Sequence, residues 1–147
     1  MTVIVRPPRV TDRSDWGRLY AGYAAFYGVT QDEAMRTRVW SWLMDANHEV
    51  TGFVAEADGR PVGLAHCRPF ARPLAAATGI FLDDLFTDPE SRGQGVVQAL
   101  IAAVRDHAAD EGATVVRWIT AADNARAMAV YDRVATRTGW VTYDIVL

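Results

Sequence analysis

The sequence predicts an α/β (α+β) protein in which a central mixed, mostly antiparallel sheet is flanked by about four helices. Three observations lead to this fold class. β-rich runs are interspersed with segments whose apolar residues recur at helical spacing, three such runs follow one another directly, and Asp58 and Gly59 mark a hairpin turn between two of them. The predicted order is β-α-α-β-β-β-α-β-α-β. A chain of 147 residues fits one domain with a sizeable core, so residues 1–147 are expected to form a single domain.

The first two predicted elements are a short strand and a helix. "TVIVRPPRV" runs into a proline pair, which predicts a strand that ends at Arg6 or Pro7. Thr11 or Asp12 can cap the helix that follows. The aromatic side chains of this helix fall at i, i+4, i+7 and i+11 and share one face: Trp16, Tyr20, Tyr23 and Tyr27. Gly28 ends the helix.

The remaining elements follow from the same two periodicities. A second helix is predicted from about residue 30 until residues 47–49, with Asp32 and Glu33 suited to the positive end of its dipole. "VTGFVAEAD", "GRPVGLAHCRPF" and "TGIFLDDLFT" predict an antiparallel meander. Residues 95–111 predict a long helix that Gly112 ends. "TVVRWIT" predicts a buried strand, "NARAMAVYDRVATRT" a helix and "WVTYDIVL" a last strand.

Composition and charge argue against several classes of function. The net charge is −3 and the 15 basic residues, all arginine, are scattered, so no nucleic-acid partner is expected. No apolar run reaches the length of a membrane span and the N-terminus lacks the features of a signal peptide, so we expect no membrane partner and a cytoplasmic location. Cys67 is the one cysteine and is expected to pack in the core. No residue spacing predicts a metal site.

A glycine-bearing turn lies between the strand "FLDDLFT" and the helix at 95–111. This turn is formed by Arg92, Gly93, Gln94, Gly95 and Val96. Backbone N–H groups at a helix start are unpaired and, with the helix dipole, favour anions, and glycines let the backbone approach a pyrophosphate closely. The same connection is common without an anion site, and the chain has neither a GxGxxG fingerprint nor a lysine.

Two stretches resemble the signatures of a known family. "DLFTDPESRGQGVVQALI" resembles the acyl-CoA-binding motif of the GNAT N-acetyltransferase superfamily, R/QxxGxG/A, with matches at Arg92 and Gly95 and a departure at Val97, where the motif has a small residue. "NARAMAVYDRVATRTGW" resembles the second signature of that superfamily, with Asn124 and Tyr131 at the matching positions. "LDDLFT" and "YDRVA" are similar to the diamine and histone acetyltransferase-like branch.

The resemblance implies acetyl-CoA as cosubstrate and no metal. The turn from Arg92 to Val97 would hold the pyrophosphate. The backbone of Leu85, Phe86 and Thr87 would hold the pantetheine arm, at the place where this strand parts from the next one in the superfamily. Asn124 would hydrogen-bond the pantetheine, cap its helix, or do both. We expect the branched side chain of Val97 to be tolerated.

The resemblance also implies direct transfer of an acetyl group to an amine. Asp83 would accept the ammonium proton and Tyr131 would donate a proton to the leaving thiolate. Strict alternation along the strand would turn only one of Asp83 and Asp84 toward the site, unless a bulge intervenes. In the alternative interpretation both acids are solvated strand-end residues and Tyr131 is a core residue.

The acceptor pocket is expected between the first two helices and the neighbouring strands. Tyr23, Tyr27, His66 and Asp84 are the substrate-binding candidates, and Arg68 shares a strand with His66, for which a hydrogen-bonded structural role is the alternative. The predicted function is an N-acetyltransferase that acts on a primary amine of a small, polyamine-like or amino-acid-like molecule in a ternary complex. The alternatives are acetylation of protein lysines or N-termini, and a noncatalytic acyl-CoA-binding module.

The segment after the last helix predicts how the chain assembles. Residues 139–147 suffice for one strand, where the superfamily usually has two. A neighbouring chain can supply the missing strand, so a homodimer is expected, and a shorter sheet is the alternative.

Overall fold

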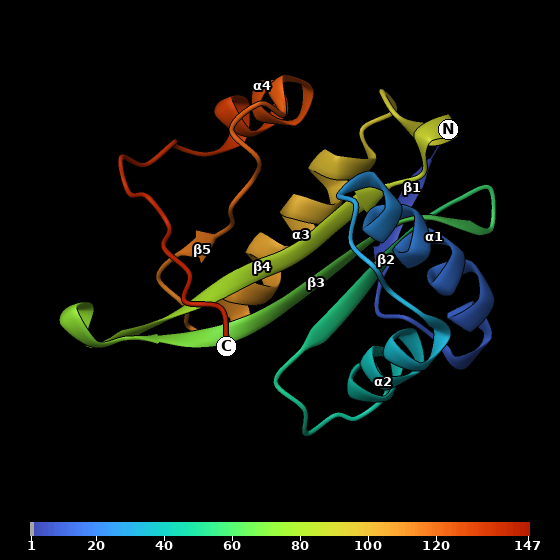
Figure 1. Ribbon diagram of the computed structural model, residues 1–147, viewed down its shortest axis with the longest axis horizontal. Coiled ribbons are helices and arrows are strands. Elements are labelled where there is room, and N and C mark those ends of the chain that lie inside the picture. Colours follow the sequence, from blue (N-terminus) through green and yellow to red (C-terminus); the bar gives the residue numbers. More distant parts are fainter. Residues whose placement is uncertain (1) are drawn as a thin grey trace.

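Five strands form one sheet in the spatial order β1-β2-β3-β4-β5 (Figure 1). The computed structural model describes residues 2–147. The strands are β1 (Val3–Arg6), β2 (Thr51–Ala57), β3 (Arg60–Arg72), β4 (Ala77–Thr87) and β5 (Val116–Arg117). Neighbours pair antiparallel as far as β4, and β5 runs parallel to β4. The predicted fold class is therefore confirmed.

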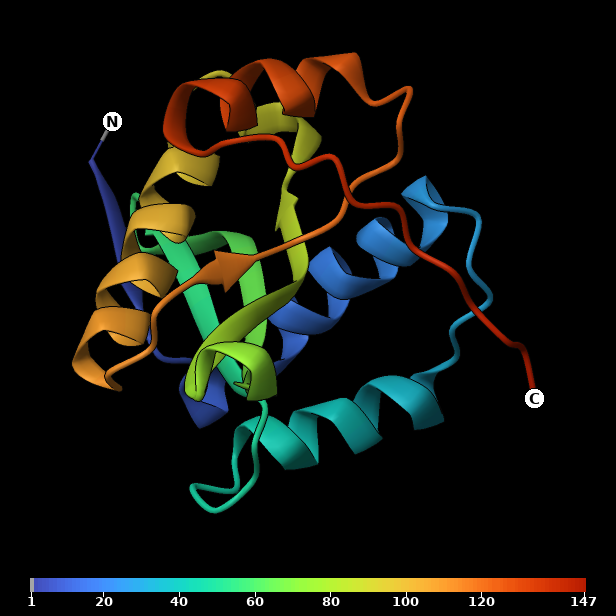
Figure 2. The ribbon, with the colours of Figure 1, turned by 90° about the vertical axis from the view of Figure 1, so that its left-hand side faces the viewer.

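Helices cover both faces of this sheet. α1 (Arg13–Phe26) and α2 (Glu33–Leu43) lie on one face, α3 (Val96–Asp110) lies on the other, and α4 (Ala125–Val134) lies beyond the end of β4 (Figure 2). Short 3-10 turns, η1 (Val10–Asp12), η2 (Pro73–Ala75) and η3 (Pro89–Ser91), connect elements. Asp32 accepts a hydrogen bond of 2.8 Å from the Met35 amide and so caps α2.

The hairpin between β2 and β3 is the one the sequence predicts. Asp58 and Gly59 have φ angles of 52° and 77°, which is the left-handed conformation of a tight two-residue turn. The N-terminal cap of α1 differs from expectation. The Asp12 carboxylate accepts bonds of 2.7 and 3.0 Å from Arg6 and of 2.6 Å from the Arg9 amide, and it makes no side-chain cap bond to α1.

Alternation along β3 and β4 divides the apolar core into two clusters. On the α3 side, Cys67 and Leu82 pack against Leu100 and Val104. On the α1 side, Leu64 and Phe86 pack with Trp16, Leu19 and Tyr20. The sheet is therefore buried on both faces where helices cover it, and side chains at even positions 64 and 66 of β3 face α1.

β4 and β5 separate after a short parallel ladder. Their pairing consists of Ile80 with Val116 and Phe81 with Arg117. Beyond Phe81, β4 has no strand neighbour on this side among the described residues. The backbone groups of β4 from Leu82 to Thr87 that face this gap are therefore available to a ligand.

A β-bulge interrupts the pairing of β3 with β4. His66 pairs with Asp84 and Cys67 pairs with Leu82, so Asp83 is the extra residue. A bulge places two residues of one strand opposite one of its partner and breaks the alternation. The exception that the sequence analysis left open, a bulge, therefore applies here, and Asp83 and Asp84 do not alternate between the two faces of the sheet.

The predicted last strand is absent from residues 2–147 of the structure. Residues 135–147 follow α4 without regular secondary structure. The apolar side chains in this segment are exposed, among them Trp140 at 86% and Ile145 at 90%. The sequence has strand character here, but a strand also needs a neighbour to pair with, and this segment has none in the described chain.

Candidate active site

A cavity of about 470 Å³ lies between the end of β4, the turn that follows, and α4. Its walls come from four parts of the chain: the end of α1, the end of β4 with the glycine turn, the first turn of α3, and one face of α4. The lining includes Tyr23, Phe26, Tyr27, Leu85, Phe86, Thr87, Arg92, Gly93, Gly95, Val96, Val97, Asn124 and Tyr131. The structure thus brings together the predicted cofactor-binding residues except Gln94.

The glycine turn presents unpaired backbone donors to this cavity. Gly93 and Gly95 adopt φ angles of +79° and +81°, which glycine reaches without a steric cost. Gly95 is the N-cap of α3. Among residues 2–147 the amides of Gly93, Gln94 and Gly95 donate to no backbone carbonyl, and the first amides of a helix have no acceptor within it. The turn therefore concentrates partial positive charge at the start of α3.

Thr87 adds a buried polar atom to the same wall. Thr87 is 5% exposed, and its side-chain oxygen Oγ1 has no hydrogen-bond partner among the described residues. A buried hydroxyl without a partner costs free energy unless a ligand or water satisfies it. Because Thr87 lines the cavity, this wall is suited to a ligand with hydrogen-bonding groups.

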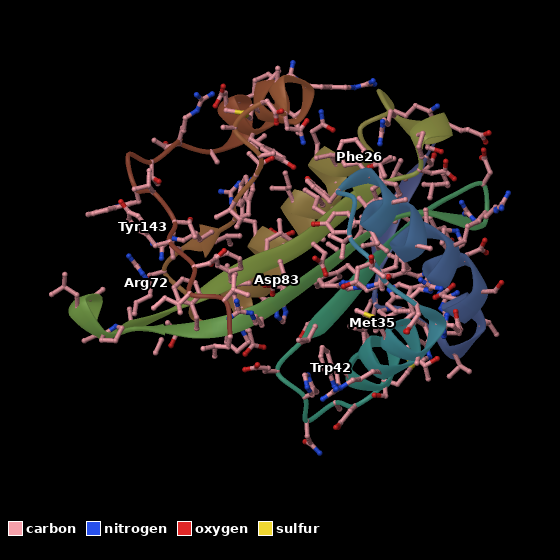
Figure 3. The ribbon with its side chains drawn as sticks, in the orientation of Figure 1. Phe26, Met35, Trp42, Arg72, Asp83 and Tyr143 are labelled. Atoms are coloured by element: carbon pink, nitrogen blue, oxygen red, sulfur yellow. The ribbon has the colours of Figure 1, made fainter. Side chains whose placement is uncertain are left out.

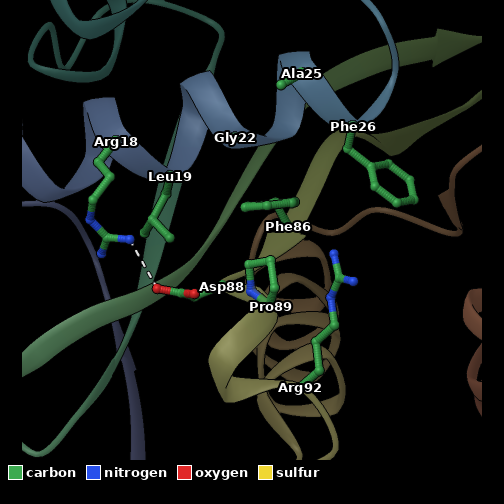
Figure 4. Close-up of a pocket in the computed structure, with 9 residues that line it drawn as sticks. All are labelled: Arg18, Leu19, Gly22, Ala25, Phe26, Phe86, Asp88, Pro89 and Arg92. Carbon is green, nitrogen blue, oxygen red and sulfur yellow. Dashed lines mark hydrogen bonds and ion pairs between the residues drawn. The ribbon is translucent and has the colours of Figure 1, made fainter.

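Arg92 separates this cavity from a second one of about 390 Å³ (Figure 4). Its guanidinium carbon lies 5.6 Å from the centroid of the Phe26 ring, within the range of a cation–π contact. The second cavity lies under α1 against Phe86, and an ion pair of 2.9 Å between Arg18 and Asp88 borders it. Arg92 is thus held beside the glycine turn by an aromatic face.

Tyr131 and Asn124 enter the first cavity from α4. The Tyr131 ring packs edge-on against Trp118 at a centroid distance of 5.4 Å, and burial raises the pKa of its hydroxyl to about 12. Such a hydroxyl is a weak acid and a good hydrogen-bond donor. Asn124 caps α4, since its Oδ1 accepts a bond of 3.4 Å from the Ala127 amide.

Other residues of α4 also line the cavity and were not singled out in the sequence. They are Arg126, Ala127, Val130 and Arg133. Ala127 and Val130 lie four residues and one residue before Tyr131, so a helical wheel centred on Tyr131 includes Ala127 on the same face. Helical spacing was therefore the signal available in the sequence.

Asp83 lies about midway along β4, outside the lining of the cavity (Figure 3). Its carboxylate pairs with Arg68, whose Nε is 3.0 Å from Oδ2 and 3.3 Å from Oδ1. Burial raises the pKa of Asp83, and the charge of Arg68 opposes that rise. The Tyr23 hydroxyl, which lines the cavity, lies 3.5 Å from the Asp83 carbonyl oxygen. Tyr23 thus contacts the backbone of Asp83, not its carboxylate, from the cavity wall.

Asp84 belongs to a buried hydrogen-bonded network on the same face. Trp16 Nε1 donates to His66 Nε2 at 3.0 Å. An indole N–H can only donate, so the neutral imidazole carries its proton on Nδ1, which lies 2.8 Å from Asp84 Oδ2. The Tyr20 hydroxyl donates to the same oxygen at 2.8 Å. Burial opposes ionisation of Asp84, but the bonds from His66 and Tyr20 outweigh it and lower the pKa of Asp84.

The bulge therefore directs both acids toward the α1 side of the sheet. Asp84 bonds to Tyr20 of α1. Asp83 pairs with Arg68, which lies two residues after His66 and so on the same face of β3. His66, a predicted substrate-binding residue, is 2% exposed and lies behind Asp84. Neither His66 nor Asp84 lines the cavity, and of the two side chains Asp84 is the more exposed, at 21%.

Residues 16–135 match the model of the Acetyltransferase (GNAT) family, and the chain belongs to this family. It is accordingly an N-acetyltransferase-type enzyme. The chain is 25% identical over 143 residues to the D-amino-acid N-acetyltransferase HPA3 of Saccharomyces cerevisiae, covering 96% of this chain and 89% of that protein. It is 35% identical over 89 residues to an L-2,4-diaminobutyric acid acetyltransferase of Nocardia farcinica, covering 60% of this chain and 45% of that protein.

Solved structures support the fold. A structure of the aminoglycoside N-acetyltransferase AAC(6')-Iy in complex with CoA superposes with a TM-score of 0.85 at 20% identity, covering 99% of this chain and 95% of that one. A ribosomal-protein-alanine N-acetyltransferase from Brucella melitensis superposes with a TM-score of 0.80 at 19% identity, covering 99% and 100% of the two chains.

Residues 2–147 contain neither a helix suited to cross a membrane nor a cluster of metal ligands. No helix there combines the length and the hydropathy that a membrane crossing requires. No group of three or more His, Cys, Asp or Glu side chains is placed to hold a metal ion in that part of the chain.

Proposed function

We propose that this protein transfers the acetyl group of acetyl-CoA to a primary amine of a small molecule, by direct attack within a ternary complex. The observation that carries the proposal is the cavity at the glycine turn. It combines unpaired amides at the start of α3 with the separated edge of β4 and the hydroxyl of Tyr131. These groups suit the pyrophosphate, the pantetheine amides and the sulfur of one extended thioester.

Different residues of the cavity would bind different parts of acetyl-CoA. The amides of Gly93 to Val97, with Arg92, would bind the pyrophosphate. The open edge of β4 at Leu85, Phe86 and Thr87 would hydrogen-bond the pantetheine, and Asn124 would contribute from α4 while capping that helix. Val97 packs partly against the core, which supports its compatibility with pyrophosphate binding.

The acceptor amine must lose a proton before it attacks. An alkyl ammonium has a pKa of about 10.4, so at neutral pH deprotonation presents an obstacle of roughly 4 kcal/mol. Asp83 would accept that proton through a water molecule, since its side chain is short and lies outside the cavity lining. The amine lies near Tyr23 and Asp84 in this arrangement, with Tyr27 at the wall between amine and cosubstrate.

The transfer then forms one bond and breaks another. The nitrogen lone pair attacks the thioester carbon and the C–N bond forms. The C–S bond then breaks with its electron pair on sulfur, and the nitrogen loses its surplus proton to water. Backbone N–H groups at the free edge of β4 would stabilise the oxyanion, a contribution of about 3 to 4 kcal/mol in comparable sites. Tyr131 would donate its hydroxyl hydrogen to the thiolate, as a proton or as a hydrogen bond.

The names of the relatives support the class of acceptor. The yeast relative is named for D-amino acids and the bacterial one for diaminobutyric acid. Both names denote small molecules with a primary amine. We extend this class to the present chain.

The test measures thiol release from acetyl-CoA in the presence of single amines, with mass spectrometry of the products. The wild-type protein should release thiol and acetylate a small amine, and Asp83→Asn should lower kcat about 10²-fold or more while acetyl-CoA binding changes little. Tight acetyl-CoA binding without thiol release from any amine would instead show a noncatalytic acyl-CoA-binding module. Acetylation of peptides alone would show a protein acetyltransferase.

We also propose that the protein forms a homodimer through residues 139–147. Val141, Tyr143, Ile145 and Leu147 occupy every second position, so one edge of an extended segment is wholly apolar. The opposite edge carries the polar Thr142 and Asp144 between Trp140 and Val146. All four apolar side chains are at least 76% exposed. A second copy of the chain supplies a strand edge at the same position, and pairing would bury these side chains and satisfy the backbone groups.

A further inference from the structure

A cationic side chain lies next to the two acids on the α1 side of the sheet. Arg68 is on β3, two residues after His66, and two residues along a strand correspond to about 6.6 Å. Its Nε binds the Asp83 carboxylate. The acid pair therefore has a fixed positive charge at one end, which would repel a second ammonium group of an acceptor placed beside it.

The guanidinium of Arg68 is oriented but its terminal nitrogens are unoccupied. Asp83 engages Nε only, and within residues 2–147 neither Nη atom has a hydrogen-bond partner. The guanidinium carbon lies 5.1 Å from the centroid of the Phe81 ring, which supports its plane. The side chain is 38% exposed. Two parallel N–H groups thus remain for a planar anion such as a carboxylate, which guanidinium groups bind in bidentate geometry.

The opposite charge is fixed nearby on Asp84. Both hydrogen bonds to its carboxylate, from His66 Nδ1 and from the Tyr20 hydroxyl, end on Oδ2. Among residues 2–147 no donor lies within hydrogen-bond distance of Oδ1, and the nearby Tyr23 hydroxyl also helps to lower the pKa of Asp84. The lowered pKa keeps this carboxylate ionised at neutral pH. The side chain is 21% exposed, so an ammonium group can reach it.

We propose that Arg68 binds the carboxylate of the acceptor and that the acceptor is an amino acid. This inference rests on the proposed function, because it names the substrate class of that reaction. The amine of such a zwitterion would lie at Asp83 and Asp84, on the side toward Tyr23 and the cavity, and its carboxylate would extend along β3 to Arg68. Polyamines lack the group that Arg68 binds.

Matched acceptors test the proposal. Phenylalanine is compared with phenethylamine, and ornithine with putrescine, because each pair differs only by the carboxylate. All measurements are made at the same pH, 8.5, because removing Arg68 also removes a charge that opposes the rise in the pKa of Asp83. For the wild-type protein, kcat/KM should be about 10- to 100-fold higher for each amino acid than for its decarboxylated partner, the effect of one charge-assisted pair.

Substitutions at Arg68 should remove that preference. Arg68→Gln should lower the ratio of kcat/KM for each amino acid to kcat/KM for its decarboxylated partner about 10- to 100-fold. Loss of the ion pair with Asp83 affects both members of a pair and cancels in this ratio. Arg68→Lys keeps the positive charge and loses the bidentate geometry. Its preference for amino acids should therefore lie between those of the wild-type protein and Arg68→Gln. Arg72→Gln is the control, because Arg72 is on the same strand, farther toward the β3–β4 hairpin (Figure 3), and bonds to Thr114. It should leave the preference unchanged.

Two results would overturn the assignment of Arg68: equal use of both members of each pair by the wild-type protein, or an amino-acid preference that survives in both folded Arg68 variants. Failure of the proposed function gives a different result, namely no thiol release with any amine. In that case the role of Arg68 is tested by calorimetry, which measures the binding of phenylalanine and of phenethylamine to the CoA-saturated protein. Selective, Arg68-dependent binding of phenylalanine supports the assignment, and equal binding or none contradicts it.

Discussion

Asp83 is the residue whose surroundings most directly determine how activity depends on pH. Burial raises the pKa of its carboxyl group, and Arg68 limits the rise. A general base works only when deprotonated, so the rate should fall as the pH drops through a pKa above the usual 3.9 or so of an aspartate. Asp83→Asn should abolish this acid limb in a profile of kcat against pH.

A surface aspartate provides the control for that profile. Asp132 is on α4, and within the described residues 2–147 its ion-pair partner is Arg137 at 3.0 Å. Asp132→Asn should preserve both the acid limb and the rate. A limb that persists in Asp83→Asn would assign the titrating group elsewhere, with Asp84 as the nearest carboxylate.

Tyr131 should affect turnover more than cosubstrate binding. Its ring contributes packing against Trp118, and phenylalanine keeps that contact. Tyr131→Phe should therefore lower kcat at least about 10-fold, the lower range for loss of a proton or hydrogen-bond donor, and change acetyl-CoA affinity little. Steady-state kinetics and calorimetry separate the two effects.

Tyr143→Phe is the control for Tyr131→Phe, because it removes the same hydroxyl group at another position. The Tyr143 side chain is 90% exposed and lies far along the C-terminal segment from α4 (Figure 3). Loss of this hydroxyl in Tyr143→Phe should alter neither kcat nor the affinity for acetyl-CoA. Equal kcat values for all three proteins would exclude Tyr131 from the reaction.

At the scale of elements, the glycine turn before α3 should bind the pyrophosphate through its backbone. Gly95→Ala places a Cβ at φ +81°, where the chain itself leaves open space within 4 Å. The left-handed conformation costs an alanine about 1 to 2 kcal/mol. The added methyl group also stands beside the amides, so acetyl-CoA affinity measured by calorimetry should fall about tenfold, which corresponds to about 1.4 kcal/mol.

Gly112→Ala separates backbone strain from ligand contact. Gly112 follows the other end of α3 with φ +73° and likewise has nothing within 4 Å of an added Cβ. Thermal unfolding should show a similar loss of stability for both variants, and only Gly95→Ala should bind acetyl-CoA more weakly. Unchanged affinity in Gly95→Ala would remove the turn from the binding site.

The elements that the sequence predicted well are those set by local physics. Helical spacing in α1 and α3 and the Asp58–Gly59 hairpin depend on neighbouring residues only, and both occur in the structure. The face of Asp83 could not be predicted, because the bulge depends on the register between β3 and β4. Thr11 or Asp12 was expected to cap α1, and Asp12 is the N-cap residue, but its carboxylate binds Arg6 of β1, a contact that only the folded chain creates.

The candidate site shows the same division. The motif around Gly95 predicted the residues that meet at the cavity, because a strand, a turn and a helix follow one another in the chain. The partners of His66 could not be predicted in the same way. Trp16 and Asp84 are 50 and 18 residues away in sequence, and packing of α1 on the sheet brings them together.

At the scale of the whole molecule, the exposed C-terminal segment predicts the oligomeric state. Light scattering should give twice the 16.2 kDa mass of one chain. Ile145→Asp places a charge on the apolar edge of the segment and should shift the protein toward a monomer, since pairing would bury that charge. A monomeric wild-type protein at micromolar concentration would contradict the dimer.

The Thr142→Asp variant is the matched control, because it places the same charge on the opposite edge of the same segment, next but one to Asp144. It should remain a dimer. In the isolated chain neither side chain contributes to the core, since residues 142 and 145 are both exposed. Changes in thermal stability should therefore follow the change in association state.

The extra residue in β4 has a consequence for how this chain can vary. Upstream of it, Leu82 is aligned with Cys67, and downstream Asp84 is aligned with His66. Removing one residue here would rotate the downstream half of the strand by half a turn. Phe86 would then turn from the α1 core toward α3, and Asp84 would turn away from the imidazole of His66. Natural variants of this strand should therefore differ in the identity of their residues and conserve their number.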